Sequence, residues 1–171
     1  MKKGLFRRIL VSYIIIVPIL FIALELYLSN VIKHNYISKL RENLIIQSRL
    51  ITEQIPTSFT NNLNDFCKKY KDKTGARITI IDGSGRVLGD SDEFSGKMEN
   101  HAGRPEIQEA SINNIGSSIR FSKTLHSDFF YLAIKLNSEG DKGFLRLSVP
   151  LHDLEKAISQ TRIQIVFASL T

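Results

Sequence analysis

Residues 76–92, ARITIIDGSGRVLGDSD, have the pattern of a strand, a turn and a second strand. Ile78 and Ile80 alternate with polar residues, which is typical of a half-buried strand. The run DGSG at residues 82–85 supplies residues that accept the backbone angles of a tight turn. Its glycines lack the GxGxxG spacing of a dinucleotide-binding loop, and no crossover helix follows them. The segment therefore predicts an antiparallel pair of strands.

Three more strand-like runs follow farther along the chain. They are GSSIRFSKTL (residues 116–125), FFYLAIKL (129–136) and GFLRLSVPL (143–151). Residues 137–143 form a polar loop that contains glycine, which predicts an antiparallel hairpin between the last two runs. Together with the first pair, these runs predict an α+β fold, a five-stranded antiparallel sheet with one face covered by helices.

The N-terminal part of the chain is apolar. Residues 9–28, ILVSYIIIVPILFIALELYL, are twenty residues with a single charge, Glu25. At about 1.5 Å per residue, a helix of this length covers the hydrocarbon core of a bilayer. No convincing cleavage site follows. We therefore expect an uncleaved transmembrane helix over 9–28, embedded in membrane lipid, and not a signal peptide. The cations among residues 1–8 predict a cytoplasmic tail, with the following domain outside the membrane.

A long helix is expected to continue from the membrane over residues 29–56. Apolar residues recur on one helical face, at Ile37, Leu40, Leu44, Ile51 and Ile55. One interpretation is a seam through which two copies of the chain pair as a homodimer. The other is a helix that packs only on its own domain, and both fit the spacing.

The rest of the chain divides into one domain and an exit helix. A second amphipathic helix is expected to end near Gly75, because apolar residues share one face at Phe59, Leu63, Phe66 and Tyr70. We expect a single extracytoplasmic domain over residues 57–153. Residues 154–171 are expected to form an exit helix and the start of a second transmembrane helix, because the apolar run IQIVFASLT is too short to span a bilayer.

Residues 95–110, SGKMENHAGRPEIQEA, are dense in titratable side chains. The chain contains neither a GxSxG nucleophile motif nor an HExxH ligand pair. We therefore expect no catalytic residue and no metal site. Arg104–Pro105–Glu106 has the pattern of a helix start, with proline in the first turn and an acid near the positive end of the helix dipole. In that helix, we expect the inward face to consist of Ile107, Ala110 and Ile112.

Charge and cysteine content narrow the function classes. The chain has a net charge of +6, part of which comes from four cations in its first eight residues. The remaining charges form no basic stripe interleaved with aromatic side chains, so we expect no nucleic-acid binding. The single cysteine, Cys67, lies at an apolar position of a predicted helix and is expected to be a small buried hydrophobe.

Four stretches of the chain carry a resemblance to a known family. They are TGARITIIDGSGRVLGDSD (residues 74–92), MENHAGRPEIQEA (98–110), GSSIRFSKTL and YLAIKL. In this order they resemble the extracytoplasmic sensor region of bacterial sensor histidine kinases of the phosphate-regulon (PhoR) type. The similarity extends from Thr74 to Leu154. It implies a PAS-like domain between two helices of the bacterial cytoplasmic membrane, with signalling through a dimer.

The resemblance implies that the chain is the sensing and transmembrane-signalling module of a two-component histidine kinase. The kinase core, which would bind ATP and pass a phosphoryl group to a response regulator, would then lie outside these 171 residues. The chain itself is expected to need no cofactor, and its stimulus is expected to be a small molecule or a protein. The alternative is the ligand-binding outer domain of another membrane receptor, a chemoreceptor or a diguanylate cyclase.

The candidate ligand site centres on Arg120. In SSIRFS, the period-two pattern places Arg120 on the opposite face from Ile119 and Phe121. A guanidinium in a partly dry cavity would bind a carboxylate or a phosphate strongly. The residues expected to complete such a site are Arg104, His101 and Tyr131. The alternative is a surface arginine paired with a nearby acid.

A thiol-labelling experiment tests the predicted membrane topology. A membrane-impermeant reagent should label a cysteine placed at Ser138 in intact cells, because residues from about 30 to about 160 are expected outside the membrane. Labelling that occurs only after lysis would contradict this orientation.

Overall fold

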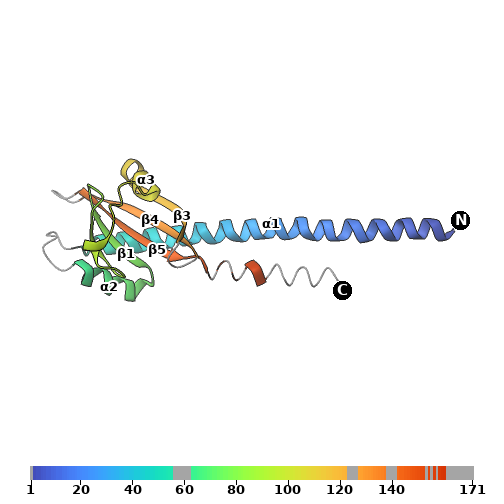
Figure 1. The fold of residues 1–171 in the computed structure, drawn as a ribbon, viewed down its shortest axis with the longest axis horizontal. Helices are drawn as coiled ribbons and strands as arrows, with labels where there is room; N and C mark the ends of the chain where they lie inside the picture. The colour runs from blue at the N-terminus through green and yellow to red at the C-terminus, as the bar shows by residue number, and fades with distance from the viewer. Residues whose placement is uncertain are drawn as a thin grey trace. The chain divides into compact units, whose positions relative to one another are not determined.

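A computed structural model describes residues 2–55, 63–122, 127–137 and 142–152, together with residues 154, 156 and 158–160. The chain divides into two compact units (Figure 1). One comprises Met1–Ser38 with His152–Thr171, and the other comprises Lys39–Leu151. The second unit holds the whole sheet, and we call it the α+β unit.

Helix α1 spans Lys2–Thr52 without interruption, so the helices expected over 9–28 and 29–56 are one element as far as Thr52. Its apolar side chains near the N-terminus are largely exposed. Among the described residues, α1 is the one helix that is long and apolar enough to cross a membrane. Most of the expected exit helix, residues 154–171, lies outside the described part of the chain.

Five strands form one antiparallel sheet, as the sequence predicts. They are β1 (Arg77–Asp82), β2 (Val87–Asp90), β3 (Ile115–Ser122), β4 (Ser127–Asn137) and β5 (Lys142–Pro150). Their order is β2-β1-β5-β4-β3, and every neighbouring pair is antiparallel. The last strand in the sequence is therefore central, hydrogen-bonded to both β1 and β4.

The register divides the sheet into two faces. The rung that joins Gly89 to Ile80 continues across β5 to Ile134. Gly116 pairs with Ala133, the neighbour of Ile134 in β4. Because successive residues of a strand point to opposite sides, Gly89 and Gly116 mark opposite faces of the sheet.

A helix packs on each face. Helix α2 (Leu63–Thr74) covers the Gly89 face, where a Cβ on Gly89 would lie 2.6 Å from the Leu63 side chain. Helix α3 (Pro105–Asn113) covers the Gly116 face, where a Cβ on Gly116 would overlap the backbone oxygen of Glu106. The sequence predicted helices on one face only. A second helical cover is present because the strands carry apolar residues on this side as well.

Each face has its own apolar core. On the α2 face, the register brings together fully buried side chains, namely Ile78, Ile80, Leu132, Leu145 and Leu147. On the α3 face, strand residues pack against two helix residues in a cluster of Ile81, Val87, Ala133, Phe144, Ile107 and Ala110. Burying apolar surface on both sides removes it from water and stabilises the sheet.

Helix α3 has the predicted start but only part of the predicted inward face. Arg104 precedes its first residue, Pro105, and the left-handed Asn114 (φ 64°) follows its last. Ile107 and Ala110 are buried, whereas Ile112 is 80% exposed. The expectation for Ile112 is wrong because two residues advance a helix by about 200°, which turns residue 112 away from the face of residue 110.

The C-terminal end of α1 packs within its own chain. Leu44, Ser48 and Ile51 lie on one helical face, and all three are buried. Leu44 and Ile51 therefore belong to the core of the α+β unit, and the structure contradicts a dimer seam through these two residues. Packing on the domain is the interpretation that holds for them. The other predicted seam residues, Ile37, Leu40 and Ile55, are half-buried.

Cys67 is buried in α2, as predicted. Burial, helped by the negative charge of Asp90, raises the pKa of its thiol to about 12. Helix α2 ends before Gly75 (φ 72°), as expected. Its expected first turn at Phe59 lies outside the described residues. Ser138, the position chosen for thiol labelling, also lies outside them. Since a buried thiol reacts only when the fold opens, Cys67 is a built-in probe of unfolding.

The packing of α1 predicts different effects for two leucine substitutions. Leu44→Ala should lower the free energy of unfolding by about 3 kcal/mol, because it leaves a cavity in the core. Leu50→Ala, at a side chain that is 60% exposed, should change it by less than about 0.5 kcal/mol. Both changes in the free energy of unfolding can be measured from the rate of Cys67 modification in increasing urea, with the whole chain in detergent micelles. Equal effects would show that Leu44 is not a core residue.

Candidate ligand-binding site

A cavity of about 430 Å³ lies on the α3 face of the α+β unit. Its walls come from β1, β3, β4 and β5 and from the segment between β2 and α3. The residues that line it are Arg77, Glu93, Lys97, Met98, Glu99, His101, Arg104, Arg120, Phe129, Tyr131, Arg146 and Ser148. The cavity is therefore mostly polar and contains four arginines.

The strand register gathers the polar side chains of this wall. Arg120 pairs with Phe129 and therefore points to the α3 face, while Ile119 and Phe121 point to the other side and are exposed. The expected alternation at Arg120 is confirmed. All four residues predicted for the site, Arg120, Arg104, His101 and Tyr131, line the same cavity. Their role in binding a ligand stays a prediction.

Two guanidiniums lie over the ring of Tyr131. The Cζ atom of Arg120 is 4.1 Å from the ring centroid, and that of Arg146 is 5.3 Å away. The face of an aromatic ring attracts cations, so Tyr131 helps to hold both arginines in place. Arg146 is only 4% exposed. Burial lowers its pKa to about 10 against the opposing effect of Glu106, so the guanidinium stays charged at neutral pH.

Glu106 is the buried counter-ion of both arginines. Its Oε1 atom accepts a hydrogen bond from Arg120 Nη2 (2.8 Å) and lies 3.5 Å from Arg146 Nη1. Its Oε2 atom accepts a hydrogen bond from the Ser118 hydroxyl (2.6 Å). Burial alone would raise the pKa of Glu106, but these hydrogen bonds and the two arginine charges lower it below its ordinary value. Arg120 thus pairs with an acid, as the alternative interpretation had it, but the acid is fully buried.

The two arginines retain donors that the protein does not use. Among the described residues, the buried Nε atoms of Arg120 and Arg146 have no hydrogen-bond partner. A buried donor without an acceptor is unfavourable by about 1–3 kcal/mol. The two guanidiniums are therefore only partly paired within the protein.

His101 is a neutral side chain at the cavity wall. It is 5% exposed, and its Nδ1 atom lies 2.7 Å from the carbonyl oxygen of Glu99. Burial and then the positive charge of Arg146 lower its pKa to about 4. Because a carbonyl can only accept, Nδ1 carries the proton of the neutral ring. Arg104 lies nearer the rim, with its Nη2 atom 3.8 Å from the Glu99 carboxylate.

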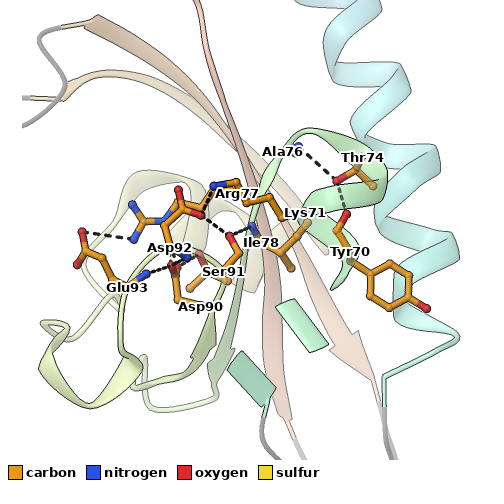
Figure 2. A network of polar contacts seen from close by, with 11 residues as sticks. Tyr70, Lys71, Thr74, Ala76, Arg77, Ile78, Asp90, Ser91, Asp92 and Glu93 are labelled. Atoms are coloured by element: carbon orange, nitrogen blue, oxygen red, sulfur yellow. Dashed lines mark hydrogen bonds and ion pairs between the residues drawn. The ribbon is translucent and has the colours of Figure 1, made fainter. Parts of the chain in front are cut away.

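A second polar network joins Arg77 to the loop that follows β2 (Figure 2). Arg77 Nε lies within hydrogen-bond distance of both oxygens of Asp90, at 3.1 and 3.2 Å. Asp90 is fully buried and also accepts hydrogen bonds from the backbone N–H groups of Asp92 and Glu93. The network therefore fixes both the cavity arginine and the start of the loop.

Thr79 connects the two networks. Its hydroxyl donates a hydrogen bond to Asp90 (2.7 Å) and accepts one from Arg146 Nη2 (3.2 Å). On the outer side, the Asn64 side chain accepts the backbone N–H of Asp90, and Lys71 forms an ion pair with Asp92. Asn64 and Lys71 both belong to α2, so a continuous polar path runs from Arg146, which we call the cavity floor together with Arg120, to that helix.

The charged residues of the site that sequence reasoning missed include Arg77, Arg146 and Glu106. The period-two alternation that singled out Arg120 could also have identified Arg146, because Arg146 stands between Leu145 and Leu147 in a strand. Glu106 was recognised only as a residue of the helix start. Among the described residues, no group of three or more potential ligands is arranged to hold a metal ion.

The low pKa of His101 predicts a loss of stability in mild acid. The unfolded chain binds a proton at His101 near pH 6.5, whereas the folded chain binds it only near pH 4. Stability due to this residue is therefore lost as the pH falls through this window, by about 2 kcal/mol between pH 8 and pH 5. Urea unfolding followed by circular dichroism should show this loss, and His101→Asn should reduce it. An equal loss in the variant would assign it to other groups.

Comparison with known proteins places this fold. The profile of the family described as "Single Cache-like" matches residues 34–150. No curated protein matches the chain. The ligand-binding domain of the Campylobacter jejuni chemoreceptor Tlp3, in complex with 4-methylisoleucine, is similar over 77% of this chain and 58% of its own, with a TM-score of 0.57 and 18% identity. The sensor domain of E. coli DcuS is similar over 72% of this chain and 97% of its own, with a TM-score of 0.57 and 9% identity.

These structures share the fold, and the chain spans less than two thirds of the Tlp3 domain. The family match covers more than half of the chain, including all five strands, α2, α3 and the cavity. This protein belongs to the single Cache-like family of sensor domains.

Proposed function

We propose that this chain is the ligand-sensing part of a membrane-anchored signalling receptor, and that its ligand is a small organic anion bound by Arg120 and Arg146. One observation carries the proposal. Two guanidiniums, each with several N–H donors, line the cavity and share one buried carboxylate. Charge-assisted hydrogen bonds from such donors to a carboxylate are stronger than neutral ones, and Arg provides them in a fixed planar geometry.

The size and the lining of the cavity favour a small-molecule ligand. The cavity volume of about 430 Å³ is in the range of pockets that enclose small ligands. Phe129 and Met98 add apolar surface to the polar wall, so a ligand with a short hydrocarbon part would bury it there. Crystal structures of the Tlp3 domain contain 4-methylisoleucine and L-norvaline, which are molecules with a carboxylate. This precedent supports a carboxylate ligand here.

The membrane helix and the basic N-terminus support an extracytoplasmic sensor. We propose that α1 anchors the chain in the bacterial cytoplasmic membrane and that the four N-terminal cations keep residues 1–8 inside. Signalling would require a homodimer in which α1 changes its position relative to its partner helix.

The proposed output is a histidine kinase of the phosphate-regulon type, on the sequence resemblance over Thr74–Leu154. Such a kinase core would bind ATP and act on a response regulator. A chemoreceptor is the second candidate, favoured by the similarity of the fold to that of the Tlp3 domain.

A panel of small organic anions tests the proposed ligand class. With the whole chain in detergent micelles, an anion that binds should slow the modification of Cys67, because binding stabilises the folded state. Arg120→Ala should lower the affinity for that anion by about 10- to 100-fold, which is the loss expected when one charged hydrogen bond is removed.

Arg86→Ala is the matched control, because Arg86 is 75% exposed and does not line the cavity. It should leave the affinity unchanged. If no anion protects Cys67, or if both variants bind equally well, the ligand is not an anion held at this site.

A further inference from the structure

We infer that Glu106 limits the charge of the ligand, so that the cavity takes a monocarboxylate in preference to a dicarboxylate or a phosphate dianion. This inference rests on the proposed function and specifies the ligand of the same site. Glu106 does not line the cavity itself. It would act through the two arginines that do.

The charge balance at the cavity floor carries the inference. Arg120 and Arg146 both approach the same oxygen of Glu106, at 2.8 and 3.5 Å. Two positive charges therefore share one negative charge, and one positive charge is left over in a region where Arg146 is nearly inaccessible to water. A buried charge without a partner is strongly unfavourable, so this floor favours one added negative charge and disfavours a second.

The other cavity cations do not change this balance. Arg77 has Asp90 at 3.1 Å and Glu93 at 3.7 Å, and Arg104 has Glu99 at 3.8 Å. The side chains of Glu93 and Glu99 are exposed, as is Lys97, so water and salt screen the charges at the rim. Among the described lining residues, the surplus of positive charge lies at Arg146, which is buried, and at Arg120, whose side chain is 26% exposed.

Glu106 is held so that it cannot leave the arginines when a ligand enters. Its second oxygen accepts the Ser118 hydroxyl at 2.6 Å, and its position in the first turn of α3 places the carboxylate near the positive end of the helix. Gly116 lies directly under the backbone of this turn, which leaves no space for the turn to shift toward the sheet. These contacts favour an incoming carboxylate that adds to Glu106 over one that replaces it.

Glu106→Gln tests the inference because glutamine keeps the shape and removes the charge. Its amide can still accept a hydrogen bond from Arg120 and donate one to Ser118. We would measure dissociation constants by isothermal titration, with the whole chain in nanodiscs, for a straight-chain series from two to six carbons. Each length would be represented by a matched monocarboxylate and dicarboxylate, such as butanoate and succinate.

The wild-type chain should bind the monocarboxylates more tightly than the dicarboxylates of equal length. In Glu106→Gln, the ratio of the two affinities should shift toward the dicarboxylate by at least about tenfold, because a second guanidinium becomes uncompensated. Glu109→Gln, the same substitution one turn later in α3 at a residue that does not line the cavity, should leave the ratio unchanged.

A second measurement needs no variant and applies even if Glu106→Gln does not fold. As the pH falls from 8 to 6, dicarboxylates become partly singly charged, so their apparent affinity for the wild-type chain should rise. Monocarboxylates stay singly charged and should show no such rise. Both ligands meet the same groups, including His101, Tyr131, Glu93 and Glu99, and a pKa of about 4 keeps His101 neutral over this range.

The outcomes separate this inference from the proposed function. Binding of anions with a wild-type preference for dicarboxylates, or with an unshifted ratio in Glu106→Gln, would overturn the role of Glu106 and leave the anion site standing. No binding of any carboxylate to the wild type would overturn the proposed function and the inference with it.

Discussion

A charged arginine in the interior of an antiparallel sheet needs a carboxylate beside it, and this need organises the α+β unit. Arg146 lies on the central strand and is almost fully buried. The carboxylate beside it comes from Glu106 in the first turn of α3, so the helix must lie directly on the sheet. That approach is possible only because Gly116, beneath α3, has no side chain. One ion pair thereby determines the position of a helix, a glycine and the wall of the cavity.

The two faces of the sheet differ in composition and in role. The α2 face is apolar and fully buried along the central strands, and the core to which α1 contributes Leu44 and Ile51 lies in the same unit. The α3 face combines a smaller apolar cluster with a polar half, in which arginines, a tyrosine and a histidine surround the cavity. Stability can therefore rest mainly on the first face, which leaves the second free to hold charged groups.

The polar path through Thr79 and Asp90 gives the cavity a physical connection to α2. Arg146 donates to Thr79, Thr79 donates to Asp90, and the backbone N–H of Asp90 donates to Asn64. Because Asp90 is fully buried and accepts several hydrogen bonds, displacement of one member leaves others without a partner. A change at the arginines that reached α2 by this route would therefore require several hydrogen bonds to rearrange together.

The sequence by itself determined the elements and the sides on which many residues lie. The period of two in GSSIRFSKTL placed Arg120 opposite Ile119, and the composition of residues 9–28 predicted an uninterrupted apolar helix, because these signals are local. It did not determine that β5 lies between β1 and β4, which is a long-range pairing. That pairing places Arg146 beside Thr79 and Tyr131, and with it the whole charge balance of the cavity. It likewise left open whether Leu44 and Ile51 face a partner or their own core, since a helical apolar face looks the same in both cases. Only the tertiary structure decided these points, because it alone shows which surfaces meet.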